Sequence, residues 1–244
     1  MMFGLSLVAF VAGFISSIAG AGGLITLPLL LWVGLPPINA LATNKVQSAL
    51  GTLSSTLNFF RKGHLDLRDM RWPIGLALIG AVCGTLLVQR VGNEILVNLI
   101  PVLLITIALY FLFAPQSPND ARSARLSPLR FSLFAALPMG FYGGFFGPGM
   151  GSIFPFLFVW LCAYDLRKAT AHTKVMVLTI NSSSALLFIL HGDVLWELAL
   201  YMSAAQIVGA YIGSNMVIHR GAAVVQPLLV VVTLVLAIKL LFFG

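Results

Sequence analysis

The sequence predicts an all-α, polytopic membrane protein made of two inverted repeats, each with a glycine-broken re-entrant helical hairpin followed by three transmembrane helices. The first observation behind this fold class is composition. Of the 244 residues, 59% are hydrophobic and 9% are charged, and the mean hydropathy is +1.02, whereas about a quarter of the residues in soluble domains are charged. Because about 20 apolar residues cross a bilayer core, the chain is long enough for about six spans and several shorter segments.

The second observation is an internal repeat. Glycine, phenylalanine and proline positions near the start of the chain recur 127 residues later, and farther along the offset becomes 129. The pairs at the first offset are Gly13/Gly140, Phe14/Phe141, Gly20/Gly147, Gly22/Gly149 and Pro28/Pro155. The pairs at the second offset are Ala42/Ala171, Lys45/Lys174, Val46/Val175, Ser54/Ser183, Ser55/Ser184, Gly63/Gly192, Gly80/Gly209 and Gly84/Gly213. A repeat of this length indicates two related halves.

The repeat divides the chain into a first half at 1–114, a cytoplasmic linker at 115–130 and a second half at 131–244. The linker is polar, rich in proline and arginine, and has no apolar helical face. In the first half we expect a broken helix at 3–19 and 24–34, then spans at 38–60, 73–90 and 95–114. In the second half we expect a broken helix at 131–146 and 150–162, then spans at 168–190, 197–218 and 222–243.

The third observation is the opposite charge of equivalent loops. Residues 61–71 carry four Lys or Arg side chains, while the equivalent residues 191–197 carry none and include Asp193 and Glu197. Basic loops stay in the cytoplasm, so the first loop should face inward and the second outward, which inverts the second half. The tryptophans fall at predicted span ends, the interfacial position: Trp32, Trp72, Trp160 and Trp196.

The two glycine clusters, at 20–23 and 147–151, predict a cavity. Non-helical backbone at membrane depth is tolerated only when it is buried in protein or lines a cavity. Each second helical arm starts directly after its glycines, so its free N–H groups and positive dipole end should point at that cavity and favour an anion. The alternative is that these glycines only permit close helix packing.

The carboxylates argue against a transported cation. Sodium and proton pathways usually use intramembrane Asp or Glu, and every carboxylate here falls in a loop or at a span end. They are Asp66, Asp69, Glu94, Asp120, Asp165, Asp193 and Glu197.

Two lysines at equivalent positions, Lys45 and Lys174, fall inside predicted spans. A lysine at a helix centre costs roughly 2.5 to 3.5 kcal/mol on insertion scales, so an anion, polar partners or water should compensate it. The alternative is that each side chain extends to the membrane interface. His172 is either a proton-coupling group or a structural residue. The predicted substrate-binding residues are Asn44, Lys45, Gln47, His172, Thr173, Lys174, Gly20, Gly22, Gly147 and Gly149.

Other functional classes find little support in the sequence. No hydrolase, metalloprotease or P-loop motif is present, so we do not expect an enzyme. The net charge of +7 comes from short loops rather than a continuous patch, so we expect no nucleic-acid partner. Cys83 and Cys162 lie in apolar segments without metal-like spacing, and we expect no disulfide, metal or cofactor. The start lacks basic residues ahead of its apolar stretch, so we expect no signal peptide.

Four segments resemble the TauE/SafE sulfite exporter family, also called TSUP, and within it the YfcA-type branch. They are Gly13 to Pro28, Asn39 to Lys45, Gly140 to Gly149 and Lys168 to Lys174. The resemblance covers essentially the whole chain. It implies a bacterial inner-membrane permease for small, often sulfur-containing anions such as sulfite or sulfonates, with Asn44, Lys45, Thr173 and Lys174 facing the substrate. Ala21 departs from the family, in which many members have glycine, so this turn should be stiffer.

We therefore expect a secondary transporter that carries small anions across the bilayer by alternating access, with both hairpins and both lysine-bearing helices around one site. A passive anion channel and a membrane scaffold without transport activity are the alternatives. The sequence predicts neither the oligomeric state, the direction of transport nor the coupling ion.

Overall fold

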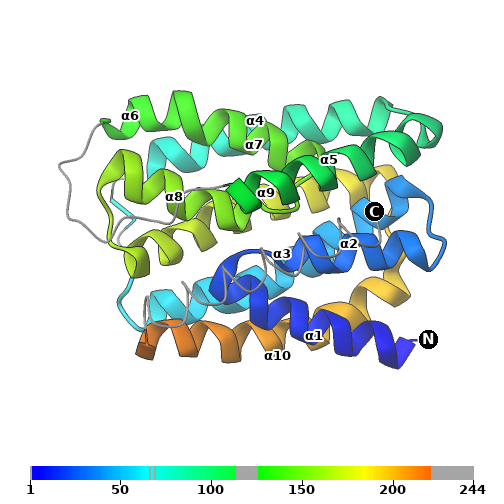
Figure 1. The fold of residues 1–244 in the computed structure, drawn as a ribbon, viewed down its shortest axis with the longest axis horizontal. Helices are drawn as coiled ribbons and strands as arrows, with labels where there is room; N and C mark the ends of the chain where they lie inside the picture. Colours follow the sequence, from blue (N-terminus) through cyan, green and yellow to red (C-terminus); the bar gives the residue numbers. More distant parts are fainter. Residues whose placement is uncertain (1, 66, 69, 114–125, 221–244) are drawn as a thin grey trace.

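The computed structural model describes residues 2–65, 67–68, 70–113 and 126–220, and this part of the chain is helical without strands (Figure 1). The helices are α1 (Met2–Ala19), α2 (Gly22–Trp32), α3 (Pro37–Arg61), α4 (Arg71–Arg90), α5 (Asn93–Phe113), α6 (Pro128–Phe131), the π-helix η1 (Ser132–Ala136), α7 (Leu137–Phe145), α8 (Met150–Cys162), α9 (Leu166–His191) and α10 (Trp196–Arg220). Apart from α6, which begins inside the expected linker, they occupy the predicted helical segments. The span expected at 222–243 and most of the expected linker lie outside the described residues.

Both glycine clusters break a helix as predicted. Gly20 has a φ of +75°, and Gly147 and Gly149 have φ of +102° and +85°, a backbone region that residues with a Cβ avoid. After the first break α2 packs against α1. The two helices approach closely at Gly22, where an added Cβ would lie only 2.7 Å from Ala12 O. At the second break, the Tyr142 hydroxyl donates to the carbonyl of Pro148. The breaks are therefore ordered turns with defined partners.

The main helix–helix contacts join one half of the chain to the other. The helix α1 of the first half packs along α10 of the second, and α7 of the second half packs along α4 of the first. Figure 1 shows these pairs at opposite edges of the molecule, with α3 and α9 between them. The helices α3 and α9 also contact one another, which brings both lysine-bearing helices to the centre.

These two helix pairs use equivalent residues. A Cβ added to Gly80 of α4 would overlap the carbonyl oxygen of Leu137, and one added to Gly209 of α10 would overlap that of Phe10. These residues are related by the offsets that the sequence repeat gives. Backbones approach this closely only where small residues line the interface. The equivalent glycines of the two halves therefore permit the same close helix packing in both pairs, α4 with α7 and α1 with α10.

Gly84 tests this close packing. An added Cβ would overlap the Phe141 backbone carbonyl, so we expect Gly84→Ala to destabilise the protein by about 1–3 kcal/mol through overpacking. Gly75 lies on the same helix, with no atom within 4 Å of an added Cβ. Gly75→Ala should therefore be neutral or stabilising by up to about 1 kcal/mol. Thermal unfolding of the purified variants checks both values, and equal transition temperatures would contradict this account of the packing.

The helix expected at 131–146 is interrupted, which the sequence analysis did not predict. The π-helical turn at Ser132–Ala136 precedes Pro138, which lies at the start of α7. Proline has no N–H to donate, and its ring clashes with the carbonyl four residues earlier, so the hydrogen-bond register shifts there. The equivalent residue of the first half is Val11, and α1 continues through it without interruption.

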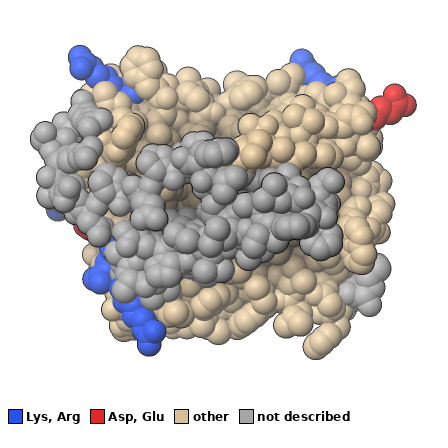
Figure 2. Space-filling model, in the orientation of Figure 1, with Lys and Arg blue, Asp and Glu red and all other residues tan. Residues whose placement is uncertain are grey.

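The outer surface is largely apolar. Two described helices, α4 and α9, are long and apolar enough to cross a bilayer, although a core helix of a soluble protein can meet the same criterion. Figure 2 shows Lys and Arg mainly toward the left end and an acidic side chain at the right end, with few charges on the visible surface between them. The tryptophans are 48% to 83% exposed and lie at or near helix ends: Trp32, Trp72, Trp160 and Trp196.

Candidate functional site

The two helix breaks meet at the centre of the described structure. A Cβ added to Gly20 would overlap the backbone of Gly151, and one added to Gly23 would lie 3.3 Å from Pro148 Cα. The Ser152 hydroxyl, in the first turn of α8, donates to the carbonyl of Ala19 at the end of α1. The starts of α2 and α8 therefore lie beside one another, each next to the other half's break.

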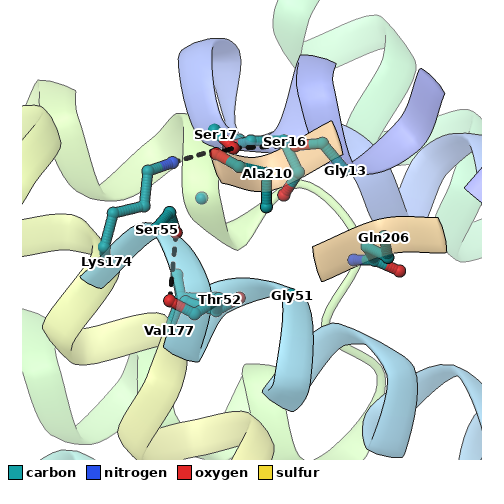
Figure 3. Close-up of a pocket in the computed structure, with 12 residues that line it drawn as sticks. Gly13, Ser16, Ser17, Gly51, Thr52, Ser55, Lys174, Val177, Gln206 and Ala210 are labelled. Carbon is teal, nitrogen blue, oxygen red and sulfur yellow. Dashed lines mark hydrogen bonds between the residues drawn. The ribbon is translucent and has the colours of Figure 1, made fainter. Parts of the chain in front are cut away.

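Each buried lysine contacts the broken helix of the opposite half. The Lys45 ammonium, on α3, donates to the carbonyl of Gly143 on α7. The Lys174 ammonium, on α9, donates to the carbonyl of Ser16 on α1 at 2.6 Å, as Figure 3 shows. Ser16 and Gly143 are separated by 127 residues, the offset of the repeat around the breaks. The two contacts are thus equivalent, and we call them crossed because the lysine of each half contacts a helix of the other half.

The lysines lie deep in the protein rather than at its surface. Their exposed fractions are 2% for Lys45 and 3% for Lys174, so neither side chain extends to the surface of the described structure. Both carbonyl partners lie near the C-terminal ends of their helices, where the negative end of the helix dipole stabilises a cation. The contacts therefore give each ammonium partial compensation.

No carboxylate balances these two charges within the described structure. Its buried polar residues include both lysines but no Asp or Glu. An isolated buried charge is costly, and carbonyl dipoles replace only part of its hydration. Two ammonium groups near the starts of α2 and α8, where the positive ends of the helix dipoles lie, form an environment that favours an anion.

Two small hollows surround the breaks, and each contains one lysine. The hollow beside Lys174 has a volume of about 10 Å³ and the hollow beside Lys45 about 30 Å³. Ser16, Gly20 and Gly151 line both. Since about 10–15 Å³ measured this way accommodates one water molecule, an oxyanion enters only if the hollows widen. The conformation is therefore closed around the lysines.

Polar side chains in the larger hollow offer hydrogen-bond donors. Asn44 accepts through its Oδ1 from Thr26 at 2.6 Å and from Gln47 at 3.1 Å. These two bonds orient the amide and leave its Nδ2 without a partner among the described residues. Asn181 lines the same hollow, is 3% exposed and forms no side-chain hydrogen bond within the described structure. These amides lie in the hollow that contains Lys45.

The predicted site residues fall into three groups in the structure. Asn44, Lys45, Lys174, Gly20, Gly147 and Gly149 line the two hollows. Gln47, Thr173 and Gly22 line neither hollow: Gln47 positions Asn44, Gly22 packs on α1, and Thr173 is buried. His172 instead lines a separate hollow near the start of α9.

Several lining residues were absent from the predicted set. Gln206 of α10 lines the hollow of Lys174, Ser48 lines that of Lys45, and Thr52 of α3 lines both. Figure 3 shows Gln206 opposite α3, across the hollow from Lys174. Gln206 is equivalent to Ala77 of the first half, so an amide that replaces an alanine within an apolar span was the signal. The described residues contain no cluster of three or more potential metal ligands.

Known proteins resemble this chain along nearly its whole length. The family profile described as "Sulfite exporter TauE/SafE" matches residues 5–240. "Probable membrane transporter protein YfcA" of Escherichia coli K12 is 44% identical over 235 residues, which cover 96% of this chain and 87% of that protein. A "Probable membrane transporter protein" of Haemophilus influenzae is 43% identical over 235 residues, or 96% of this chain and 92% of that protein.

A more distant relative shows the same relation. "Probable membrane transporter protein YdhB" of Bacillus subtilis is 22% identical over 214 residues, covering 86% of this chain and 87% of that protein. No solved structure matches the chain. The family resemblance that the four sequence segments indicated is confirmed.

Proposed function

Because this chain belongs to the TauE/SafE sulfite exporter family, we propose that it is a secondary transporter that carries a small anion across a bacterial inner membrane. The proposed substrates are sulfur-containing anions such as sulfite or organic sulfonates. Their negative oxygens match two ammonium groups, unpaired amide donors and the N-terminal ends of two helices.

The crossed lysine contacts carry this proposal. Lys45 reaches α7 of the second half, and Lys174 reaches α1 of the first half. An anion between the breaks would compete with the two carbonyls for both ammonium groups. Its entry or departure would therefore change contacts between the halves, which is what coupling a substrate to a conformational change requires. Fixed, surface-facing lysines would give no such link.

We further propose that the halves are inverted in the membrane, with multiple crossings and the loop after α3 in the cytoplasm. The opposite charges of the equivalent loops support this orientation, and the matching glycine contacts support the equivalence of the halves. In such transporters the substrate site lies near the midplane where the repeats meet, and access alternates by movement of one unit against another. The central breaks and lysines fit this position.

Counterflow in proteoliposomes tests the transporter against a channel. Vesicles preloaded with unlabelled sulfite should accumulate radiolabelled sulfite transiently above its outside concentration, because a carrier exchanges one bound anion for another. Protein-free vesicles and vesicles preloaded with potassium chloride are the controls. Single-channel currents without counterflow would instead establish a passive pore. Neither counterflow, current nor anion-dependent thermal stabilisation, with sulfite and several sulfonates, would favour a scaffold.

A further inference from the structure

A larger hollow lies apart from the central lysines, where the turn after α3 meets the start of α9. Its volume is about 270 Å³, and Gly63, His64, Asp165, Arg167, Lys168 and His172 are among the residues that line it. Gly63 has a φ of +72°, and the His64 N–H donates to Phe59 O at 3.0 Å. This glycine turn ends α3 and brings His64 to the first turn of α9.

The hollow is cationic. Arg167 and Lys168 are both half-buried, and within the part of the chain that the structure describes neither forms an ion pair. The Lys168 ammonium lies 4.1 Å from the centroid of the Tyr164 ring, which holds it in place. Asp165 supplies the single described carboxylate in the lining, and one of its oxygens accepts from the Lys168 N–H at 3.0 Å as the N-cap of α9.

His172 forms a buried part of the lining of the hollow. His172 is buried at 1% exposure, and its Nδ1 lies 2.8 Å from the carbonyl of Lys168. Its ring packs edge-on against Tyr164, with centroids 5.0 Å apart. Lys174 lies six positions after Lys168 on α9, which is about 9 Å along the helix axis. The hollow and the central site therefore share α9, with lining residues less than two helical turns apart along its backbone.

At the equivalent place in the other half, helix and loop are joined by direct hydrogen bonds. Asn39 Nδ2 donates to the Asp193 carbonyl at 2.8 Å, and the Leu195 N–H donates to Thr43 Oγ1 at 3.3 Å. The repeat offset pairs Asn39 with Lys168. One of the two places thus has direct hydrogen bonds between loop and helix, where the other has cationic side chains around an open hollow. The repeat alone does not account for this difference.

We propose that this hollow binds a small tetrahedral oxyanion group, a sulfo or phospho group, through Arg167, Lys168 and His64. The guanidinium and ammonium supply charge-assisted hydrogen bonds. The idea that the anion then passes to Lys174 rests on the proposed function, but binding in the hollow does not. The same group is present in a free anion such as sulfate and in the headgroup of an anionic lipid.

Calorimetric titration of sulfate separates the hollow from the central site. The double variant Lys45→Met/Lys174→Met, in nanodiscs of phosphatidylcholine, should still bind sulfate. Adding Arg167→Gln should weaken that binding about tenfold, the loss expected for one charge-assisted hydrogen bond. Arg90→Gln, at an exposed arginine of α4 outside the hollow, is the matched control and should change nothing. Lys168→Gln should repeat the effect if Arg167→Gln fails to fold.

A second measurement, with an anionic lipid, distinguishes a lipid headgroup from a free anion as the source of the bound group. If a headgroup occupies the hollow, phosphatidylglycerol in the nanodisc should compete with sulfate, and Arg167→Gln should reduce its retention during purification in detergent. Sulfate binding that depends on Arg167 and is indifferent to phosphatidylglycerol indicates a free anion. If neither sulfate nor phosphatidylglycerol binding depends on Arg167 or Lys168, the site is overturned.

The two proposals fail separately. Loss of flux in the lysine variants, with anion binding independent of Arg167 and Lys168, would overturn the hollow and leave the transporter standing. Arg167-dependent binding with unchanged flux in the lysine variants would support the hollow and overturn the central transport site. If both hold, Arg167→Gln should raise the KM for anion flux about tenfold with little change in maximal rate, because it weakens capture rather than translocation.

Discussion

Replacing Lys45 or Lys174 with methionine is expected to lower anion flux in proteoliposomes by about a hundredfold or more. Methionine keeps most of the side-chain volume but removes the charge. Removing one partner of a buried charge interaction costs about 3–5 kcal/mol, and the proposed anion would lose that interaction once the hollows have widened to admit it. Because the lysines make equivalent, crossed contacts, both substitutions should have effects of similar size. Initial rates of radiolabelled sulfite uptake measure the loss.

Lys62→Met is the matched control, because Lys62 is exposed after the end of α3 and lines neither central hollow. It should leave the maximal rate unchanged. Thermal unfolding of each variant, with and without sulfite, separates a role in binding from a role as a helix cap. If the lysines only stabilise the ends of α1 and α7, the variants will melt earlier yet keep their sulfite-dependent shift. Flux within twofold of the unmodified protein in both variants would overturn the central site.

The helices were predictable because the information for them is local. Apolar runs bounded by glycine and proline predicted a helix at 38–60, and α3 spans Pro37–Arg61. The glycine clusters likewise predicted both breaks. The π-helical turn was missed because a proline inside an apolar helix permits several local responses. The turn at Ser132–Ala136 packs against α4, and such a tertiary contact leaves no local pattern in the sequence.

The lysine positions were predictable, but their partners were not. Two charged residues in equivalent spans indicated a site, since charges at membrane depth need compensation. That Lys45 donates to the other half's carbonyl depends on how α3 lies against α7, which no sequence spacing determines. Gln206 was missed because the repeat was followed mainly through residues that are identical in both halves, and the equivalent residue of the first half is Ala77. A mismatch, amide against alanine, marked this residue.

The contact between the two helix breaks gives the largest expected effect on stability. Gly20→Ala forces a side chain into a φ of +75°, and its Cβ would overlap the backbone of Gly151. The left-handed backbone costs about 1–2 kcal/mol, and overpacking adds about 1–3 kcal/mol. Because the clash is with backbone, no side-chain rotation relieves it, and α8 has to move away from α1. We expect most of the protein to aggregate on extraction.

Gly34→Ala separates the two contributions, because Gly34 has a φ of +87° but no atom within 4 Å of an added Cβ. It should lose only the backbone term of about 1–2 kcal/mol and keep its flux. Thermal unfolding in detergent and the monodisperse fraction on size exclusion compare the variants. Any Gly20→Ala protein that remains folded should transport poorly, since moving α8 separates the breaks that border both lysine hollows. Equal losses in the two variants would mean that the contact between Gly20 and Gly151 contributes nothing beyond backbone strain.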